Sequence, residues 1–230
     1  MIDPVVLSRV PGVHESDLTD EALDQLPAGD PPPAPWTCRA SAVLWLARAP
    51  RAARAALPPA LRDRRPVGVV GGMVRYRDTP VGAYDEVFGQ VGYLRGGRPR
   101  STVALMAVDS PASLVGGRAN WAMPKALVRF DGDPTTSMTA STAGWRVTSH
   151  VRPLGPALPI RTTAIVEQQG PDGVLRTCRM VAHGRLRPAL VRTEIRSTGP
   201  LARWLRPGPH LGLVGDEIEF TLSPTRPLGG

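Results

Sequence analysis

Apolar and polar residues alternate in many short segments between residues 36 and 222 of this chain. A period of two predicts β-strands that bury one face. Gly96-Gly97 is typical of a hairpin turn between two of these segments, and Pro171-Asp172-Gly173 of a turn between two others. The expected strands cover residues 36–49, 67–76, 84–94, 101–108, 121–130, 137–142, 145–154, 160–168, 174–186 and 211–222.

Only a few short segments favour helices. Ser16 or Thr19 can cap the first of them. Ser110-Pro111 is a good start for another, which Gly116-Gly117 is expected to end. The expected helices or helical turns cover residues 16–26, 50–57, 110–117 and 201–205. Many short strands with few helices predict a mainly β (α+β) fold, a single antiparallel β-barrel or sandwich with short helices packed outside.

The first 35 residues differ from the rest of the chain. Residues 30–35 hold four prolines in the run Asp-Pro-Pro-Pro-Ala-Pro, which forms an extended spacer and cannot continue a helix. The whole chain of 230 residues is long enough for one sizeable domain. We therefore expect an N-terminal extension over residues 1–35 and one β domain over residues 36–230.

Composition excludes several classes of protein. No apolar run approaches the ~18 residues that a membrane span needs, and the N-terminus lacks a basic-then-apolar signal pattern. Two cysteines and four scattered histidines form neither a disulfide framework nor a metal-ligand spacing, and His150 and His183 are expected on strand surfaces. These features predict a cytoplasmic protein without a membrane anchor or a structural metal.

The net charge of +8 raises the question of nucleic acid. The arginines are spread along the chain, and only 5% of the residues are aromatic, so few side chains can stack on bases. We therefore expect no nucleic-acid partner, although a basic surface can attract acidic substrates or proteins.

One basic residue stands apart. Of the 28 Lys and Arg residues, 27 are Arg, and the single lysine, Lys125, lies in the apolar run Trp-Ala-Met-Pro-Lys-Ala-Leu-Val over residues 121–128. Lysine, unlike arginine, can lose its proton and become a nucleophilic amine. The alternative interpretation is one chance surface lysine, which fits poorly with apolar neighbours in a strand-like segment.

Three segments around this lysine resemble one family. Residues 116–125 read Gly-Gly-Arg-Ala-Asn-Trp-Ala-Met-Pro-Lys, residues 80–86 read Pro-Val-Gly-Ala-Tyr-Asp-Glu, and Trp-Thr-Cys-Arg at 36–39 begins a strand that is followed by Leu-Pro-Pro-Ala-Leu ending at residue 61. In one ungapped frame these resemble the acetoacetate decarboxylase family over roughly residues 36–130. The resemblance places the functional Arg of the family on Arg39, a functional Glu on Glu86 and its Schiff-base Lys on Lys125.

The resemblance implies a β-barrel or cone, a homo-oligomer, and a keto acid as small-molecule substrate. It implies that Lys125 forms a covalent imine, so that no other cofactor is required, that Glu86 moves protons, and that Arg39 holds a substrate carboxylate. Tyr84, Trp121 and Met123 are expected to contact the substrate as pocket walls. The family is itself the established example of a lysine activated by desolvation or by a neighbouring cation. We expect the apolar wall to lower the pKa of Lys125 in the same way.

Two positions depart from the namesake of the family. Ala126 stands where it has a second lysine, and the same frame puts Gly71 where it has a second active-site glutamate. Three hypotheses therefore remain open. The chain decarboxylates a β-keto acid, or it uses the imine for aldol condensation, dehydration or cyclisation of an oxo acid, for example in secondary metabolism. The third is a non-catalytic barrel that binds a small acid, with Lys125 as counter-ion.

Overall fold

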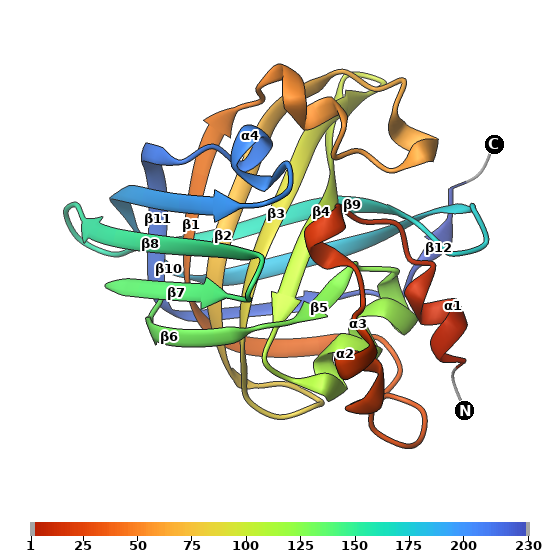
Figure 1. Ribbon diagram of the computed structural model, residues 1–230. Coiled ribbons are helices and arrows are strands. Elements are labelled where there is room, and N and C mark those ends of the chain that lie inside the picture. Colours follow the sequence, from red (N-terminus) through yellow and green to blue (C-terminus); the bar gives the residue numbers. More distant parts are fainter. Residues whose placement is uncertain (1–2, 229–230) are drawn as a thin grey trace.

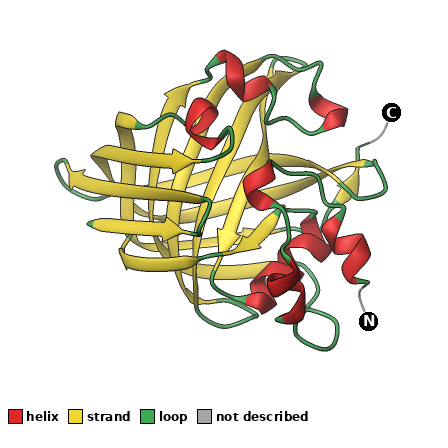
Figure 2. Cartoon of the chain, in the orientation of Figure 1, coloured by secondary structure: helices red, strands yellow, loops and turns green. Residues whose placement is uncertain are grey.

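The computed structural model describes residues 3–228, which form mainly strands. The strands are β1 (Trp36–Arg48), β2 (Pro66–Asp78), β3 (Tyr84–Arg95), β4 (Arg98–Val108), β5 (Lys125–Leu127), β6 (Arg129–Asp133), β7 (Ser137–Ser141), β8 (Trp145–Pro153), β9 (Leu158–Gln169), β10 (Leu175–Ser197), β11 (Gly208–Leu222) and β12 (Arg226–Pro227). The helices are α1 (Pro4–Ser8), α2 (Asp20–Asp24), α3 (Pro111–Trp121) and α4 (Leu201–Leu205), with 3-10 turns at His14–Ser16, Arg51–Arg54 and Pro59–Leu61. They lie at the edges of the strand framework (Figure 2).

Seven strands close into a ring in the order β11-β1-β2-β3-β4-β9-β10, because β10 pairs in turn with β11. All pairings in the ring are antiparallel except that of β4 with β9, a single parallel pair of Ser101 with Val166. The long strand β10 leaves the ring in its second half and continues the sheet through β8, β7 and β6 (Figure 1). The predicted mainly β barrel with short outer helices is thus confirmed.

Strands β1 to β4 separate two clusters of buried apolar residues. Side chains alternate between the two faces of a strand. On one face Trp45, Met73 and Leu105 pack with side chains from β7, β8, β10 and α4. On the other face Cys38, Val74 and Met106 point into the ring. We call the first the packed face and the second the cavity face.

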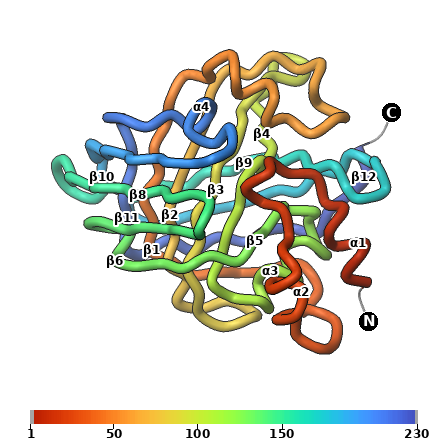
Figure 3. The backbone as a smooth tube through the Cα atoms, in the orientation of Figure 1, coloured from red at the N-terminus to blue at the C-terminus, as the bar shows by residue number. Residues whose placement is uncertain are grey.

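The segment before β1 packs on the barrel. Figure 3 shows the N-terminal tube running past α3 and β5. The backbone N–H of Val13 donates to the carbonyl of Ala104 in β4 at 3.0 Å. Helix α2 is capped by Thr19, whose hydroxyl accepts from the N–H of Ala22, as predicted. The division of the chain at residue 36 stays a prediction. No helix within residues 3–228 is long and apolar enough to span a membrane.

Two elements extend further than the sequence predicted. Helix α3 passes through Gly116-Gly117 and ends at Trp121, with Ala122 in the left-handed conformation at φ 52°. A Cβ on Gly116 would lie 2.3 Å from the Trp36 ring, so this glycine permits close packing and does not end the helix. Strand β10 runs past residue 186 to Ser197. Pro188 within it lies just after a register shift, where proline is tolerated.

Candidate functional site

The cavity face of the ring encloses a cavity of about 250 Å³. Its walls come from β1, β2, β3, β4, β9, β10 and β11, together with the end of α3. Most of the lining is aliphatic or aromatic. Among the described residues that line it, Glu86 is the only acidic residue and Lys125 the only basic one. The predicted wall residues Tyr84, Trp121 and Met123 all line this cavity.

Lys125 reaches the cavity from the first residue of β5 and is 3% exposed. Its Nζ donates to Glu86 Oε2 at 2.9 Å and to Ser113 Oγ at 2.8 Å. It also lies 5.0 Å from the centroid of the Tyr84 ring, a cation–π distance. The chance surface lysine is therefore excluded, because the amine is buried and held by three neighbours.

Glu86 points into the cavity from β3 and is buried. Its Oε1 accepts a hydrogen bond from the hydroxyl of Tyr76 at 3.0 Å, while Oε2 faces the lysine. Burial, followed by the charge of Glu86, raises the pKa of Tyr76. Burial also raises the pKa of Tyr84 to about 12, so both phenols keep their protons at neutral pH. Glu86 thus accepts one hydrogen bond from the amine of Lys125 and one from the neutral hydroxyl of Tyr76.

The expected lowering of the Lys125 pKa is wrong for this resting arrangement. Burial acts to lower the pKa of Lys125, but the charges and hydrogen bonds of Glu86 and Tyr84 act against it and raise the pKa above its ordinary value of 10.5. An ammonium group with a carboxylate at 2.9 Å is stabilised in its charged form. A neutral amine here requires transfer of the proton to an acceptor such as Glu86.

Arg39 does not join this group. Its side chain is 69% exposed and its Nε donates to Glu219 at 3.0 Å on the outside of β1. The strand alternates, so Trp36, Cys38 and Ala40 face inward and Arg39 faces outward. The structure thus contradicts the prediction that Arg39 holds a carboxylate beside Lys125. The residue that β1 brings to the cavity is Cys38, and burial raises its thiol pKa to about 12.

The two departures from the family pattern lie off the cavity. A Cβ on Gly71 would meet the Trp45 ring on the packed face, 2.3 Å away. Ala126 is also buried on the packed face. Neither position lines the cavity. The cavity positions of β2 are Val70, Val74 and Tyr76.

The backbone around Lys125 is fixed by two buried side chains. Arg118 donates through Nε to the carbonyl of Lys125 at 2.7 Å and also binds the carbonyls of Leu7 and Ser16. Burial lowers the pKa of Arg118 to about 10. Gln168 of β9 donates to the carbonyl of Ala122 at 3.1 Å. These bonds set the direction in which the lysine leaves the backbone.

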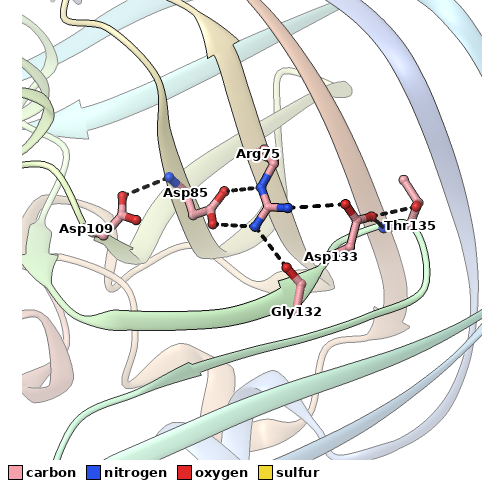
Figure 4. A network of polar contacts seen from close by, with 6 residues as sticks. All are labelled: Arg75, Asp85, Asp109, Gly132, Asp133 and Thr135. Atoms are coloured by element: carbon pink, nitrogen blue, oxygen red, sulfur yellow. Dashed lines mark hydrogen bonds and ion pairs between the residues drawn. The ribbon is translucent and has the colours of Figure 1, made fainter.

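The start of β3 is fixed on its other side by a polar network (Figure 4). The guanidinium of Arg75 binds both oxygens of Asp85, at 2.9 and 2.8 Å, and also Asp133 at 3.2 Å. The backbone N–H of Asp85 donates to Asp109 at 2.8 Å. Since Asp85 and Glu86 are adjacent and point to opposite faces, the network holds Glu86 in register with the lysine.

Three residues at the site escaped the sequence analysis: Ser113, Tyr76 and Cys38. Ser113 comes from the first turn of α3, and a Cβ on Gly117 would lie 2.5 Å from the lysine side chain. Small residues at 113, 116 and 117 form one face of this helix, and that spacing was the available signal. Tyr76 and Cys38 follow from strand alternation once the inward positions are known. His150 and His183 lie at exposed strand positions, as expected. No group of three potential metal ligands occurs within the described range.

Comparison with known proteins agrees with this geometry. The family model described as acetoacetate decarboxylase matches residues 24–207. The fold is similar to a structure described as acetoacetate decarboxylase (15% identity, 91% of this chain and 98% of that chain, TM-score 0.64). It is also similar to the enduracididine biosynthesis enzyme MppR complexed with pyruvate (16% identity, 88% of this chain and 93% of that chain, TM-score 0.63). A third similar structure is an acetoacetate decarboxylase-like enzyme from Sphingomonas wittichii RW1 (15% identity, 86% of this chain and 94% of that chain, TM-score 0.63). No curated protein matches the chain.

Proposed function

Because the chain belongs to the acetoacetate decarboxylase family, we propose that it is a Schiff-base-forming lyase that decarboxylates a β-keto acid through Lys125. The observation that carries the proposal is the pair of Lys125 and Glu86, 2.9 Å apart and buried in the wall of an apolar cavity. A buried ion pair adds little to stability compared with apolar residues of the same volume. A chemical role explains why this pair lies beside an open cavity.

The first step is to free the amine. Lys125 donates its proton to Glu86 Oε2 along the existing 2.9 Å hydrogen bond. A substrate that fills the cavity displaces water, and in a drier site a neutral acid and amine become less costly than two ions. The amine then adds to the ketone carbon and the carbinolamine loses water, with Glu86 returning the proton that hydroxide needs to leave. The product is a protonated imine.

Loss of CO2 from this imine suits an apolar cavity. The bond electrons of the departing carboxylate move into the protonated imine, so a cation and an anion become a neutral enamine and neutral CO2. Opposite charges disappear in this step, and surroundings of low dielectric favour such a change over water. The scarcity of other charged groups in the lining therefore supports decarboxylation.

The remaining steps restore the enzyme. A proton from solvent, delivered through Glu86 or through a water held by it, adds to the enamine carbon, and a water molecule then hydrolyses the imine to release the ketone and the lysine. Ser113 Oγ, 2.8 Å from Nζ, and the neighbouring ring of Tyr84 keep the nitrogen in place throughout. A cytoplasmic location, a homo-oligomeric state and the absence of any cofactor beyond the imine remain parts of this proposal.

A second candidate is the same imine used without loss of CO2, in an aldol condensation, dehydration or cyclisation. The likeness to MppR complexed with pyruvate favours it, because pyruvate is an α-keto acid. The carboxylate of pyruvate would be retained through an aldol reaction, and it would need a cation in the cavity once the protonated imine becomes a neutral enamine. Arg39 lies outside, and the described lining offers no other cation. We therefore place decarboxylation first.

Product analysis separates the two candidates. Purified protein is incubated with a panel of β-keto and α-keto acids, and released CO2 and proton exchange of the substrate with D2O are measured together. CO2 release above the spontaneous rate from β-keto acids supports decarboxylation. Exchange without CO2 release supports the second candidate. Neither signal with any acid contradicts the proposed function.

A further inference from the structure

The cavity continues away from the reactive pair as an apolar passage. Glu86 and Gln90 both line it from β3, and four residues of strand span about 13 Å at ~3.3 Å per residue. At the level of Gln90, β2 contributes Val70, and Leu44 of β1 lines the cavity opposite Gly72, two residues nearer Glu86. Gln90 is the polar side chain that β3 brings to this end. Water needs two to four polar partners to be well held, so this end of the cavity is poorly suited to water.

The apolar surface does not stop at the cavity. Val70 pairs directly with Leu46 of β1, which pairs with Leu211 of β11, which pairs with Leu190 of β10. Paired residues of neighbouring strands share one face, so these leucines continue the cavity face outward. Leu46 is 51% exposed, Leu211 71% and Leu190 44%. We call Leu46, Leu190 and Leu211 the leucine row.

On the basis of the proposed imine chemistry, we infer that the substrate is a β-keto acid with a long apolar chain. Its keto acid end meets Lys125 and Glu86, and its chain follows the cavity face toward the leucine row. A short polar keto acid would use only the end near Lys125 and leave the rest of the apolar wall facing water. The cavity of about 250 Å³ has room for roughly eight water volumes of ~30 Å³, more than such an acid needs beside the lysine.

A chain-length series on the unaltered protein tests this inference. The value of kcat/KM is measured for straight-chain β-keto acids of four to ten carbons, with imine formation followed by borohydride reduction and mass spectrometry. Each added methylene that is buried should raise kcat/KM by about fourfold, at ~0.8 kcal/mol per CH2. A flat or falling series, with imine formed from acetoacetate, overturns the chain-length inference alone. Absence of imine with every acid overturns the proposed function as well.

A pair of surface variants tests the path of the chain. Leu211→Asp adds a charge to the leucine row, and Leu94→Asp adds one at a similarly exposed leucine of β3 outside that row. The ratio of kcat/KM for the longest acid to that for acetoacetate should fall about tenfold in Leu211→Asp, because the chain would meet a hydrated carboxylate. It should be unchanged in Leu94→Asp. Equal ratios in both variants contradict a path along the leucine row.

Discussion

Strands β1 to β4 form a filled apolar core on one face and the wall of a cavity on the other. On the packed face, Trp45, Met73 and Leu105 are completely buried against a second layer of sheet and α4. On the cavity face, alternate residues of the same strands border a cavity of about 250 Å³ and carry the lysine and glutamate pair. The packed face can thus stabilise the strands while the cavity face stays open for chemistry.

This difference shows how a small β protein can tolerate buried charges. Removing apolar contacts from a filled core costs several kcal/mol, whereas a buried ion pair is close to neutral in its effect on stability. Gly71 and Ala126 illustrate the separation, since both lie on the packed face although each neighbours a cavity position in sequence. Substitution of either residue should affect the stability of the fold more than it affects turnover.

The largest effect is expected when the nucleophile is replaced. Lys125→Arg keeps a positive charge opposite Glu86 and removes the amine that can form an imine. We expect turnover to fall by more than about 10³-fold. Decarboxylation assays measure this, and thermal unfolding verifies that the variant is folded. Activity within tenfold of the unaltered protein would contradict covalent catalysis.

Glu86→Gln separates the two influences on the lysine. Burial is the largest influence on the pKa of Lys125 and lowers it, and Glu86 is the main influence that raises it. With the neutral amide, only Tyr84 still opposes burial, so the pKa should fall below its ordinary value of 10.5. Turnover should drop by about 10²- to 10⁴-fold because the proton acceptor is lost. The pH dependence of borohydride-trapped imine reports the pKa. A pKa that stays as high as in the unaltered protein would show that Glu86 does not control it.

Leu105 and Met106 are adjacent in β4 and lie on opposite faces, so truncating each in turn compares the two faces. Leu105→Ala cuts a side chain from the packed face and should lower the free energy of unfolding by about 3–5 kcal/mol. Met106→Ala removes a side chain that already borders open space, so fewer contacts are lost, and we expect about 2 kcal/mol or less. Urea unfolding measures both. Activity should change more in Met106→Ala, and the reverse order in stability would contradict the distinction between the faces.

The smallest effect concerns pH. The pKa values of Cys38 and Tyr84, raised to about 12 from ordinary values of 9.0 and 10.0, mean that the folded protein holds these protons more tightly than the unfolded chain. Their contribution is fully present below pH 9 and is lost as the pH rises toward 12. Urea midpoints should therefore fall above pH 9, and less steeply in Cys38→Ala. An identical slope in that variant would rule out the thiol as a contributor.

The sequence predicted the strands of the ring well because the physics is local. Alternation marked β1 to β4, and Gly96-Gly97 marked the hairpin in which both glycines take positive φ. The end of α3 was missed because glycines that permit close packing resemble glycines that end a helix. The second half of β10, in which Pro188 lies beside a register shift, was also missed.

The reactive pair was predictable and its surroundings were not. A lone lysine in an apolar run indicated Lys125, and the motif frame indicated Glu86. The same frame failed for Arg39, since a matching position in sequence does not give the direction of a side chain. Likewise, burial alone predicted a lowered pKa of Lys125. Only the folded chain brings Glu86 to 2.9 Å from the lysine, and this contact reverses the direction.

Intact-mass spectrometry after borohydride reduction shows whether Lys125 bonds covalently to a keto acid. With one lysine in the chain, only Lys125 and the N-terminal amine can form a reducible imine. We expect one secondary amine per chain between the lysine and the decarboxylated product of a β-keto acid, absent in Lys125→Arg. No adduct with any keto acid, or an adduct that persists in Lys125→Arg, would contradict it.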